Sequence, residues 1–235
     1  GLGGTIQYTH NLANALARAG DEVLLVTAID NELAPFPRDY DLMGVFDRFT
    51  PHFGPLAAFF RRVRAFRPDI VHFQGAQRPE FYLLVWGLLR LLTRARFVWT
   101  PQDVLSNSLK PYHQRMLRYV YARMRHVFLN AAQNAGPVHE MFGVPKDRIT
   151  VMPMPDLLAF ARGDLGRAEP PELALDAGQP MLLCFGLIEE RKGIGTLIEA
   201  FAQLRAGGTQ ASLLIMGKGL TDVAQFQEAI AATLR

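Results

Sequence analysis

The chain has 235 residues, of which 49% are hydrophobic and 20% are charged, so it can bury the core of one large domain or two modest ones. This composition excludes a disordered chain, and a formal net charge of +3 gives no overall field that would attract nucleic acid. The single cysteine, Cys184, excludes an intrachain disulfide framework and is typical of a reducing compartment such as the cytoplasm.

Short apolar runs alternate with helical periodicity along the chain. The runs that predict strands are Glu22–Thr27, Asp69–Phe73, Arg96–Thr100, His126–Asn130, Ile149–Pro153, Met181–Gly186 and Ser212–Gly217. Two of the apolar stripes that predict helices are Leu12, Ala15, Leu16, Ala19 and Leu197, Ala200, Phe201, Leu204. Because the strand runs are almost continuously hydrophobic, we expect parallel strands covered on both faces, in a doubly wound α/β fold.

Glycines crowd the start of the chain, where Gly1, Gly3 and Gly4 precede the first predicted helix. Glycine lets the backbone approach an anion at a helix N-terminus, where free N–H groups favour negative charge. The third glycine of a dinucleotide fingerprint would fall at Ile6, so the match to that motif is poor. A loop that contacts phosphate or sugar and a simple tight turn both fit this spacing. His10, on the helix that follows, is expected to face solvent.

The segment Pro55–Asp69 predicts an amphipathic helix with four arginines beside its apolar stripe. The stripe comprises Leu56, Phe59, Phe60, Val63 and Phe66, and the arginines are Arg61, Arg62, Arg64 and Arg67. One interpretation places the helix on an anionic membrane, with the arginines at the headgroups. The other buries the stripe on the sheet and leaves the arginines in solvent. The apolar run from Phe81 is too short to span a bilayer and contains Arg90, so it predicts a buried helix.

The alternation of strands and helices is interrupted once, between Pro155 and Pro180. We therefore predict a first domain at residues 1–155, a linker at residues 156–178 and the start of a second domain at residues 179–235. The first domain lacks a strand before its glycine loop, and the sequence stops inside a helical pattern, so we expect a fragment truncated at both ends. Two Rossmann-like domains of this kind bind ligands at the carboxyl ends of their strands.

A basic turn follows the strand that ends at Gly186, because Arg191 and Lys192 stand just before a predicted helix. A cation is unfavourable beside the positive end of a helix dipole unless an anion neutralises it. The arrangement suits a diphosphate leaving group, whose charge grows as its bond to a sugar breaks. Alternatively, Glu189 and Glu190 neutralise the two cations in exposed ion pairs.

Six segments, in this order, resemble the family 4 glycosyltransferases. They are Gly3–Thr27, Arg67–Gly75, Val98–Val104, Phe142–Asp156, Phe185–Leu204 and Leu213–Gly219. The resemblance implies a GT-B fold, with two Rossmann-like domains and a cleft between them. It also implies a hexosyltransferase that moves a sugar from a nucleotide-sugar donor to a glycan or lipid-linked acceptor, with retention of configuration and no metal or other cofactor. The donor would bind mainly to the second domain and the acceptor to the first.

Matched to the family, Lys192 corresponds to a lysine that contacts the donor diphosphate. Gly3 and Gly4 correspond to a glycine loop near the diphosphate and the acceptor. Many relatives have an arginine where this chain has Leu187, and Arg191 is a candidate to replace it.

The pair Gln102–Asp103 corresponds to a His-Asp pair that acts near the donor sugar and the acceptor, so these are the candidate catalytic residues. Glutamine can hydrogen-bond a sugar hydroxyl but takes up no proton at neutral pH. His72 and Lys218 are further candidates for the cleft, against the alternatives of a packed histidine and a surface turn.

Two alternatives remain open at this point. The departures at Gln102 and Leu187 fit a catalytically silent relative that binds sugar nucleotides. A nucleotide-sugar epimerase or oxidoreductase of similar architecture is disfavoured by the missing glycine at position 6 and by the basic turn. We expect a cytoplasmic protein without a nucleic-acid partner. Contact with the inner face of an anionic membrane would be peripheral, through the arginine-rich helix.

Overall fold

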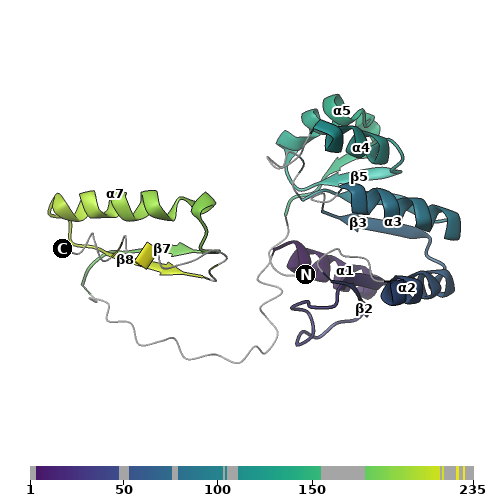
Figure 1. The fold of residues 1–235 in the computed structure, drawn as a ribbon, viewed down its shortest axis with the longest axis horizontal. Helices are drawn as coiled ribbons and strands as arrows, with labels where there is room; N and C mark the ends of the chain where they lie inside the picture. The colour runs from purple at the N-terminus through teal and green to yellow at the C-terminus, as the bar shows by residue number, and fades with distance from the viewer. Residues whose placement is uncertain are drawn as a thin grey trace. The chain divides into compact units, whose positions relative to one another are not determined.

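The computed structural model describes residues 4–47, 53–75, 79–102, 104, 111–154, 178–217, 219, 226–227 and 230. The chain divides into two compact units, Gly1–Gly166 (unit 1) and Arg167–Arg235 (unit 2), and each is described by itself. Figure 1 draws both units, with helices and strands alternating along the chain. Apart from Gly178, the predicted linker lies outside the described residues.

The described part of unit 1 contains two parallel sheets, with helices before the first sheet, between the two sheets and between the strands of the second (Figure 1). The first sheet pairs β1 (Leu24–Ala28) with β2 (Asp41–Phe46), and helix α1 (Gly4–Arg18) precedes it. The second has the order β3 (Ile70–Gln74), β4 (Arg96–Thr100), β5 (His126–Leu129) and β6 (Ile149–Val151). Its connections contain α3 (Pro79–Leu92), α4 (Pro111–Tyr121), η1 (Ala132–Asn134), α5 (Ala135–Phe142) and η2 (Lys146–Arg148). The parallel pairing confirms the predicted α/β class.

Strand β2 was missed by the sequence pattern. It begins with Asp41 and contains Gly44, and both residue types are depleted in strands. The glycine suits the packing, because a Cβ at position 44 would lie only 3.0 Å from the Cα of Ile29 and would crowd that backbone. The residue that lowers the strand propensity is therefore the one that lets β1 and the following turn approach β2.

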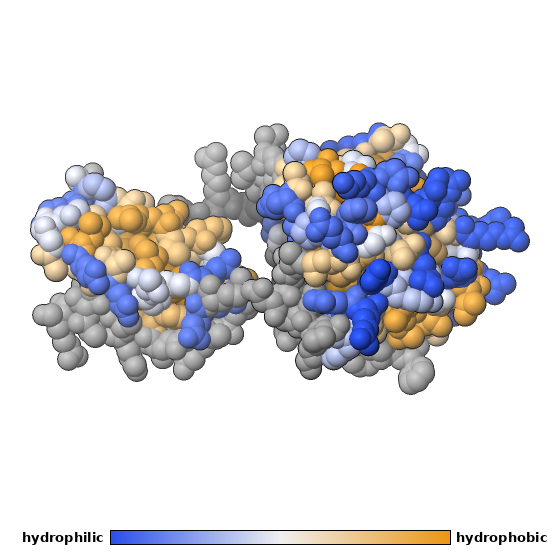
Figure 2. Space-filling model, turned by 90° about the horizontal axis from the view of Figure 1, so that it is seen from above, coloured by the Kyte–Doolittle hydropathy of each residue, from blue (hydrophilic) through white to orange (hydrophobic). Residues whose placement is uncertain are grey.

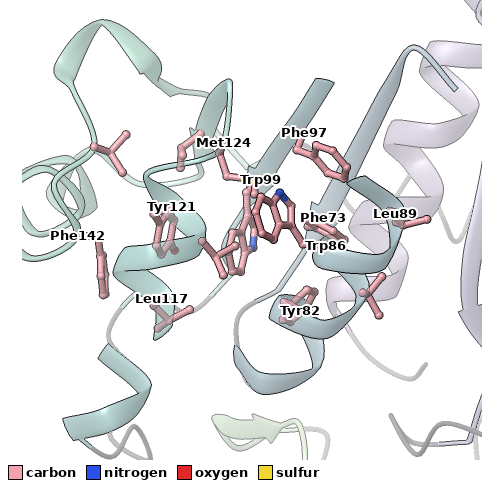
Figure 3. Close-up of a cluster of buried hydrophobic side chains, with 14 of the residues drawn as sticks. Phe73, Tyr82, Trp86, Leu89, Phe97, Trp99, Leu117, Tyr121, Met124 and Phe142 are labelled. Atoms are coloured by element: carbon pink, nitrogen blue, oxygen red, sulfur yellow. The ribbon is translucent and has the colours of Figure 1, made fainter. Parts of the chain in front are cut away.

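An aromatic core fills the space between the second sheet and its helices (Figure 3). Trp99 of β4, Tyr121 of α4 and Phe142 of α5 stack in series, with ring centroids 4.7 and 4.8 Å apart. Tyr82 and Trp86 bring α3 into the same cluster, which confirms the prediction that this apolar segment is a buried helix. Among the described residues, no helix is both long and apolar enough to cross a membrane.

Helix α1 buries a different face from the one predicted. Leu16 of the predicted stripe is 37% exposed, whereas His10 is only 4% exposed, so the expectation that His10 faces solvent is wrong. The buried face includes Ile6, Tyr8, Thr9, His10, Ala13 and Asn14. Polar residues can occupy this face because they are hydrogen-bonded: His10 Nδ1 lies 2.7 Å from the Tyr40 hydroxyl.

Helix α2 (Phe53–Phe66) packs its apolar stripe on the core. Phe59 and Val63 are buried, and Leu56 and Phe60 pack against the same cluster, so the interpretation that buries this stripe is confirmed. The arginines of the helix stay exposed, and Arg62 forms an ion pair with Asp41. Contact between these arginines and a membrane stays a prediction.

Unit 2 pairs β7 (Met181–Phe185) in parallel with β8 (Ser212–Met216), joined through η3 (Glu190–Lys192) and α7 (Ile194–Ala206). Helix α7 buries Ile194 and Ile198, whereas Leu204 of the predicted stripe is 41% exposed, so the expected face is displaced. Large apolar side chains of β7 are exposed, and Phe185 reaches 80% exposure. Figure 2 shows wide hydrophobic areas on this unit, at the left of the view.

Candidate functional site

Polar side chains gather at the carboxyl ends of β3, β4 and β5. Gln74 ends β3, Gln102 follows β4 by two residues, and Asn130 directly follows β5. Because parallel strands bring their carboxyl ends to one edge of the sheet, residues far apart in sequence meet there. Of these three residues, only Gln102 was predicted from the sequence as a site residue, and Gln74 and Asn130 were missed. The signal that could have found them is their position, since each is a polar residue at the end of an apolar strand.

These three residues form a hydrogen-bonded series, here called the amide chain. Asn130 Nδ2 donates to Gln102 Oε1 at 3.3 Å, and Gln102 Nε2 donates to Gln74 Oε1 at 3.5 Å. Gln74 then turns its Nε2 toward His72 Nε2, at 3.2 Å. Because an amide nitrogen only donates, His72 Nε2 must accept, and the proton of the neutral imidazole is on Nδ1.

His72 lies inside β3 and is tied to the neighbouring strand. Its Nε2 lies 2.7 Å from the hydroxyl of Thr100, which is fully buried in β4. The Thr100 hydroxyl also hydrogen-bonds the phenol of Tyr8 on α1. Burial lowers the pKa of His72 to about 4, so the imidazole is neutral at pH 7 and acts here as an acceptor.

Two buried amide atoms in α1 and at the end of β5 have no hydrogen-bond partner among the residues that the structure describes. They are Asn130 Oδ1, at the start of the amide chain, and Asn11 Nδ2 on α1. An unpaired buried polar atom costs roughly 1–3 kcal/mol, so such atoms often mark a place where water or a ligand completes the bonding. The amide chain therefore offers a free acceptor at one end and a neutral histidine at the other.

For several predicted site residues, the structure provides no contact that supports a role in the site. Gly3, Asp103 and Lys218 lie outside the described residues. Gly4 begins α1, and a Cβ at this position would meet open space, so close packing does not require a glycine there. Its exposed backbone belongs to the helix N-terminus, where N–H groups lack intrahelical acceptors.

In unit 2, the carboxyl ends of β7 and β8 approach each other at two glycines. The N–H of Gly186 donates to the Met216 carbonyl at 3.0 Å. A Cβ at Gly217 would lie 1.5 Å from the carbonyl oxygen of Gly186, which no side chain could accommodate without separating the strands. This contact fixes the strand ends from which the basic turn starts.

Lys192 is the last residue of η3 and is exposed. Gly193 separates it from α7, whose first N–H groups carry the positive end of the helix dipole. The described part of the chain places no carboxylate in an ion pair with Lys192, and Glu190 of the same turn is also exposed. Arg191 lies between them in η3. An anion would therefore find a lysine and a helix N-terminus side by side.

Within the described residues, no three His, Cys, Asp or Glu side chains lie together as a metal site would require. The polar chemistry at the carboxyl ends of β3, β4 and β5 in unit 1 is that of neutral amides, a hydroxyl and an imidazole, whereas the turn at Lys192 in unit 2 presents positive charge. The first set suits hydroxyl groups, and the second suits phosphate.

A family model described as Glycosyltransferase Family 4 matches residues 2–155. The chain belongs to this glycosyltransferase family. The match covers most of unit 1, including the amide chain, and confirms the resemblance seen in the sequence.

One curated relative of this family 4 chain is the D-inositol 3-phosphate glycosyltransferase of Nocardia farcinica (strain IFM 10152). It is 32% identical over 175 residues, which are 65% of this chain and 39% of the relative. The chain therefore spans about two fifths of that protein.

Solved structures show the same fold at low identity. Anabaena HepE in complex with UDP and glucose superposes with a TM-score of 0.63 and 16% identity, over 97% of this chain and 62% of HepE. UDP-N-acetylglucosamine 2-epimerase from Rickettsia bellii gives a TM-score of 0.53 and 10% identity, over 98% of this chain and 62% of the epimerase. The fold is thus that of the GT-B glycosyltransferases and is shared with an epimerase, while the family match separates the two.

Proposed function

We infer that this family 4 chain carries the donor-diphosphate and acceptor elements of a glycosyltransferase that uses a nucleotide-sugar donor and retains anomeric configuration. The observation that carries the inference is the exposed Lys192 beside the N-terminus of α7, without a described carboxylate partner. The family match and the UDP and glucose found with HepE support the same class of donor.

On this proposal the donor diphosphate binds at Lys192, Arg191 and the first N–H groups of α7. Breaking the bond between sugar and diphosphate leaves negative charge on the phosphate oxygens. Fixed positive groups stabilise that charge more in the transition state than in the bound donor, so they accelerate the reaction. Neither a metal nor another cofactor is assigned to this step.

The acceptor hydroxyl is proposed to bind at the amide chain of unit 1. Gln102 would donate to or accept from a sugar or polyol oxygen, with Asp103 as its neighbour and Gly3 and Gly4 near the diphosphate. The free Oδ1 of Asn130 would accept a hydroxyl hydrogen. A glycan or lipid-linked acceptor fits this neutral polar surface, and the name of the Nocardia relative points to a polyol acceptor in that protein.

The second candidate function is a catalytically silent protein that binds sugar nucleotides. It is favoured by Gln102, because neither this side chain nor the buried His72 takes up a proton near neutral pH. The two proposals agree on donor binding and differ on turnover.

Incubating the full-length protein with a panel of nucleotide sugars and mixed polyol, glycan and lipid-linked acceptors tests both. Mass spectrometry should detect a product larger than the acceptor by one sugar, and NMR should show the anomeric configuration of the donor. Lys192→Ala should lose product, whereas Lys146→Ala, a matched exposed lysine of η2, should not. Donor binding by calorimetry without any product would favour the silent protein, and absence of both would reject the donor site.

A further inference from the structure

Unit 1 has a hollow at the amino ends of its strands, on the opposite edge of the sheet from the amide chain. Its volume is about 330 Å³, at the lower end of the range for small-ligand sites. The segments that enter β4, β5 and β6 line it together with the last turns of α3. These segments are held side by side, since the N–H of Arg125 donates to the Phe97 carbonyl at 2.6 Å.

The lining of this hollow, here called the arginine hollow, is strongly basic. Its arginines are Arg90, Arg94, Arg96, Arg123, Arg125 and Arg148. No acidic side chain is among the described residues that line it, and none of these arginines is in an ion pair with a described carboxylate. The acidic residues Asp69 and Asp147 stand on nearby segments but do not line the hollow.

A second observation points to an anionic ligand in the same place. Trp86 lines the arginine hollow, is only 6% exposed, and carries an indole N–H for which the described residues provide no acceptor. The guanidinium carbons of Arg90 and Arg123 lie 5.6 and 5.8 Å from its ring centroid. Figure 3 shows Trp86 in the cluster with Phe97 and Met124, both of which also line the hollow. The wall of the hollow thus combines clustered cations with a buried N–H donor that has no acceptor among the described residues.

We propose that the arginine hollow binds the phosphate groups of a polyanion. Guanidinium groups keep their charge at any physiological pH, and their planar forks match phosphate oxygens in pairs of hydrogen bonds. Several phosphates on one ligand would relieve the mutual repulsion of the arginines, and one oxygen would accept the indole N–H of Trp86. Free polyphosphorylated molecules and the headgroups of anionic lipids share this chemistry.

The first arm of the test measures the binding of sodium tripolyphosphate to the full-length protein by calorimetry. The variant Arg94→Glu with Arg125→Glu should reduce the affinity at least about a hundredfold, because each exchange replaces an attractive contact by a repulsive one. The control, Arg115→Glu with Arg205→Glu, changes the net charge equally at exposed arginines of helices α4 and α7. It should change the affinity by less than about threefold.

Trp86→Phe provides a sharper variant, since it removes the indole N–H and keeps an aromatic ring in the core. We expect affinity for tripolyphosphate to fall about tenfold, as for a lost hydrogen bond to a charged group. Circular dichroism checks that the variant is folded. If Trp86→Phe is folded and its affinity for tripolyphosphate is unchanged, the indole N–H does not contact the polyanion, and the proposed site is wrong.

The second arm measures co-sedimentation with vesicles of phosphatidylglycerol in phosphatidylcholine, against vesicles of phosphatidylcholine alone. Binding to the anionic vesicles that is lost in the Arg94→Glu, Arg125→Glu variant assigns the hollow to lipid headgroups. Binding of tripolyphosphate alone assigns it to a free ligand. If neither probe distinguishes this variant from the Arg115→Glu, Arg205→Glu control, the arginine hollow is solvated surface and the proposal is wrong. Transferase activity is not part of this readout, so the outcome is independent of the proposed function.

Discussion

Asn14 Nδ2 donates to His10 Nε2 at 3.1 Å, and this contact fixes the proton of His10 on Nδ1. The orientation of the Asn14 amide is itself set, because its Oδ1 accepts the N–H of Asp39 at 2.9 Å. His10 Nδ1 therefore donates to the Tyr40 hydroxyl, and the series joins α1 to the segment that precedes β2. A second proton on His10 would face the donating amide of Asn14. The neutral imidazole is therefore the form that this network accepts.

The first prediction concerns pH. Burial, followed by the charges of Arg38 and Arg18, lowers the pKa of His10 in the folded chain. Below the unfolded pKa of 6.5 the unfolded state binds more protons, so stability present above that pH is lost as the pH falls. Between about pH 7.5 and about pH 5, the free energy of unfolding should fall less in His10→Gln than in the unchanged chain.

Urea titrations followed by tryptophan fluorescence would measure this, because both tryptophans, Trp86 and Trp99, belong to unit 1. Some pH dependence should remain in His10→Gln, since His72, with its pKa lowered to about 4, contributes in the same direction. If the free energy of unfolding depends on pH equally in the two proteins, the pKa of His10 does not differ between the folded and unfolded states.

A second prediction addresses the donor site. Lys192→Ala in the full-length protein should lower kcat/KM by about 2–4 kcal/mol of transition-state stabilisation, the range for one preorganised electrostatic contact. Glu190→Ala serves as the control, because its side chain is exposed in the same turn. Steady-state kinetics with a saturating acceptor would measure both. Equal kcat/KM in all three proteins would remove Lys192 from the donor site.

The amide chain gives a third prediction. Gln102→Ala breaks both of its hydrogen bonds and should lower the transfer rate about tenfold or more, by the loss of roughly 1–2 kcal/mol of positioning. Gln102→His should retain or raise activity, because an imidazole can accept from Asn130 and donate to Gln74 as the amide does. Product formation would be followed by mass spectrometry. Full activity of Gln102→Ala would show that this position does not contact substrate.

A fourth prediction is that replacing two tyrosines of the aromatic core by phenylalanine changes the free energy of unfolding in opposite directions. The hydroxyl of Tyr121 is buried without a hydrogen-bond partner in the described part of the chain, and burial raises its pKa. The hydroxyl of Tyr82, in contrast, donates to the Gln74 carbonyl. Tyr121→Phe should therefore leave the free energy of unfolding unchanged or raise it by up to about 1 kcal/mol, and Tyr82→Phe should lower it by about 1 kcal/mol. Thermal unfolding of the two variants tests the difference. A clear loss in Tyr121→Phe would reveal a bonded hydroxyl.

The exposed arginines of α2 support a fifth prediction. Peripheral binding to anionic vesicles should be weakened by salt and by Arg61→Glu with Arg62→Glu, because each basic residue near such a surface contributes about 1 kcal/mol. Arg62 also pairs with Asp41, so the single change Arg61→Glu separates loss of charge from loss of that ion pair. Equal recovery in the supernatant with anionic and neutral vesicles would contradict membrane contact through α2.

The strands with continuous apolar sequence were predictable because the pattern lies in their own residues. The expectation that both faces of every strand are covered is wrong for β7, whose large apolar side chains are exposed among the described residues. Strand β2 was not, since Gly44 serves a contact with Ile29 that only the fold reveals. The buried face of helix α1 was predicted wrongly for a different reason. Its buried polar residues are satisfied by partners 25 and 30 residues away, at Asp39 and Tyr40, and a helical period counts only apolar side chains.

The residues of the candidate site likewise fall into those that local sequence predicts and those that only the fold brings together. Gln102 and Lys192 could be named from their positions in motifs, because the motif and the residue are local. The bonds of Gln102 to Gln74 and Asn130 each join residues 28 positions apart and arise only when parallel strands align their ends. The arginine hollow was likewise invisible, since its residues are scattered over four segments that meet at the amino edge.

The contact between Gly186 and Gly217 also limits how this protein can evolve. The Gly186 carbonyl occupies the place where a Cβ at position 217 would stand, so every amino-acid replacement of Gly217 meets the backbone of the residue that follows β7. We therefore expect that no single substitution at position 217 is tolerated. The exposed apolar face of β7 nearby carries no such restriction from packing within the described residues. Amino-acid substitutions in unit 2 should therefore accumulate on its exposed surfaces and spare the glycine at which the ends of β7 and β8 meet.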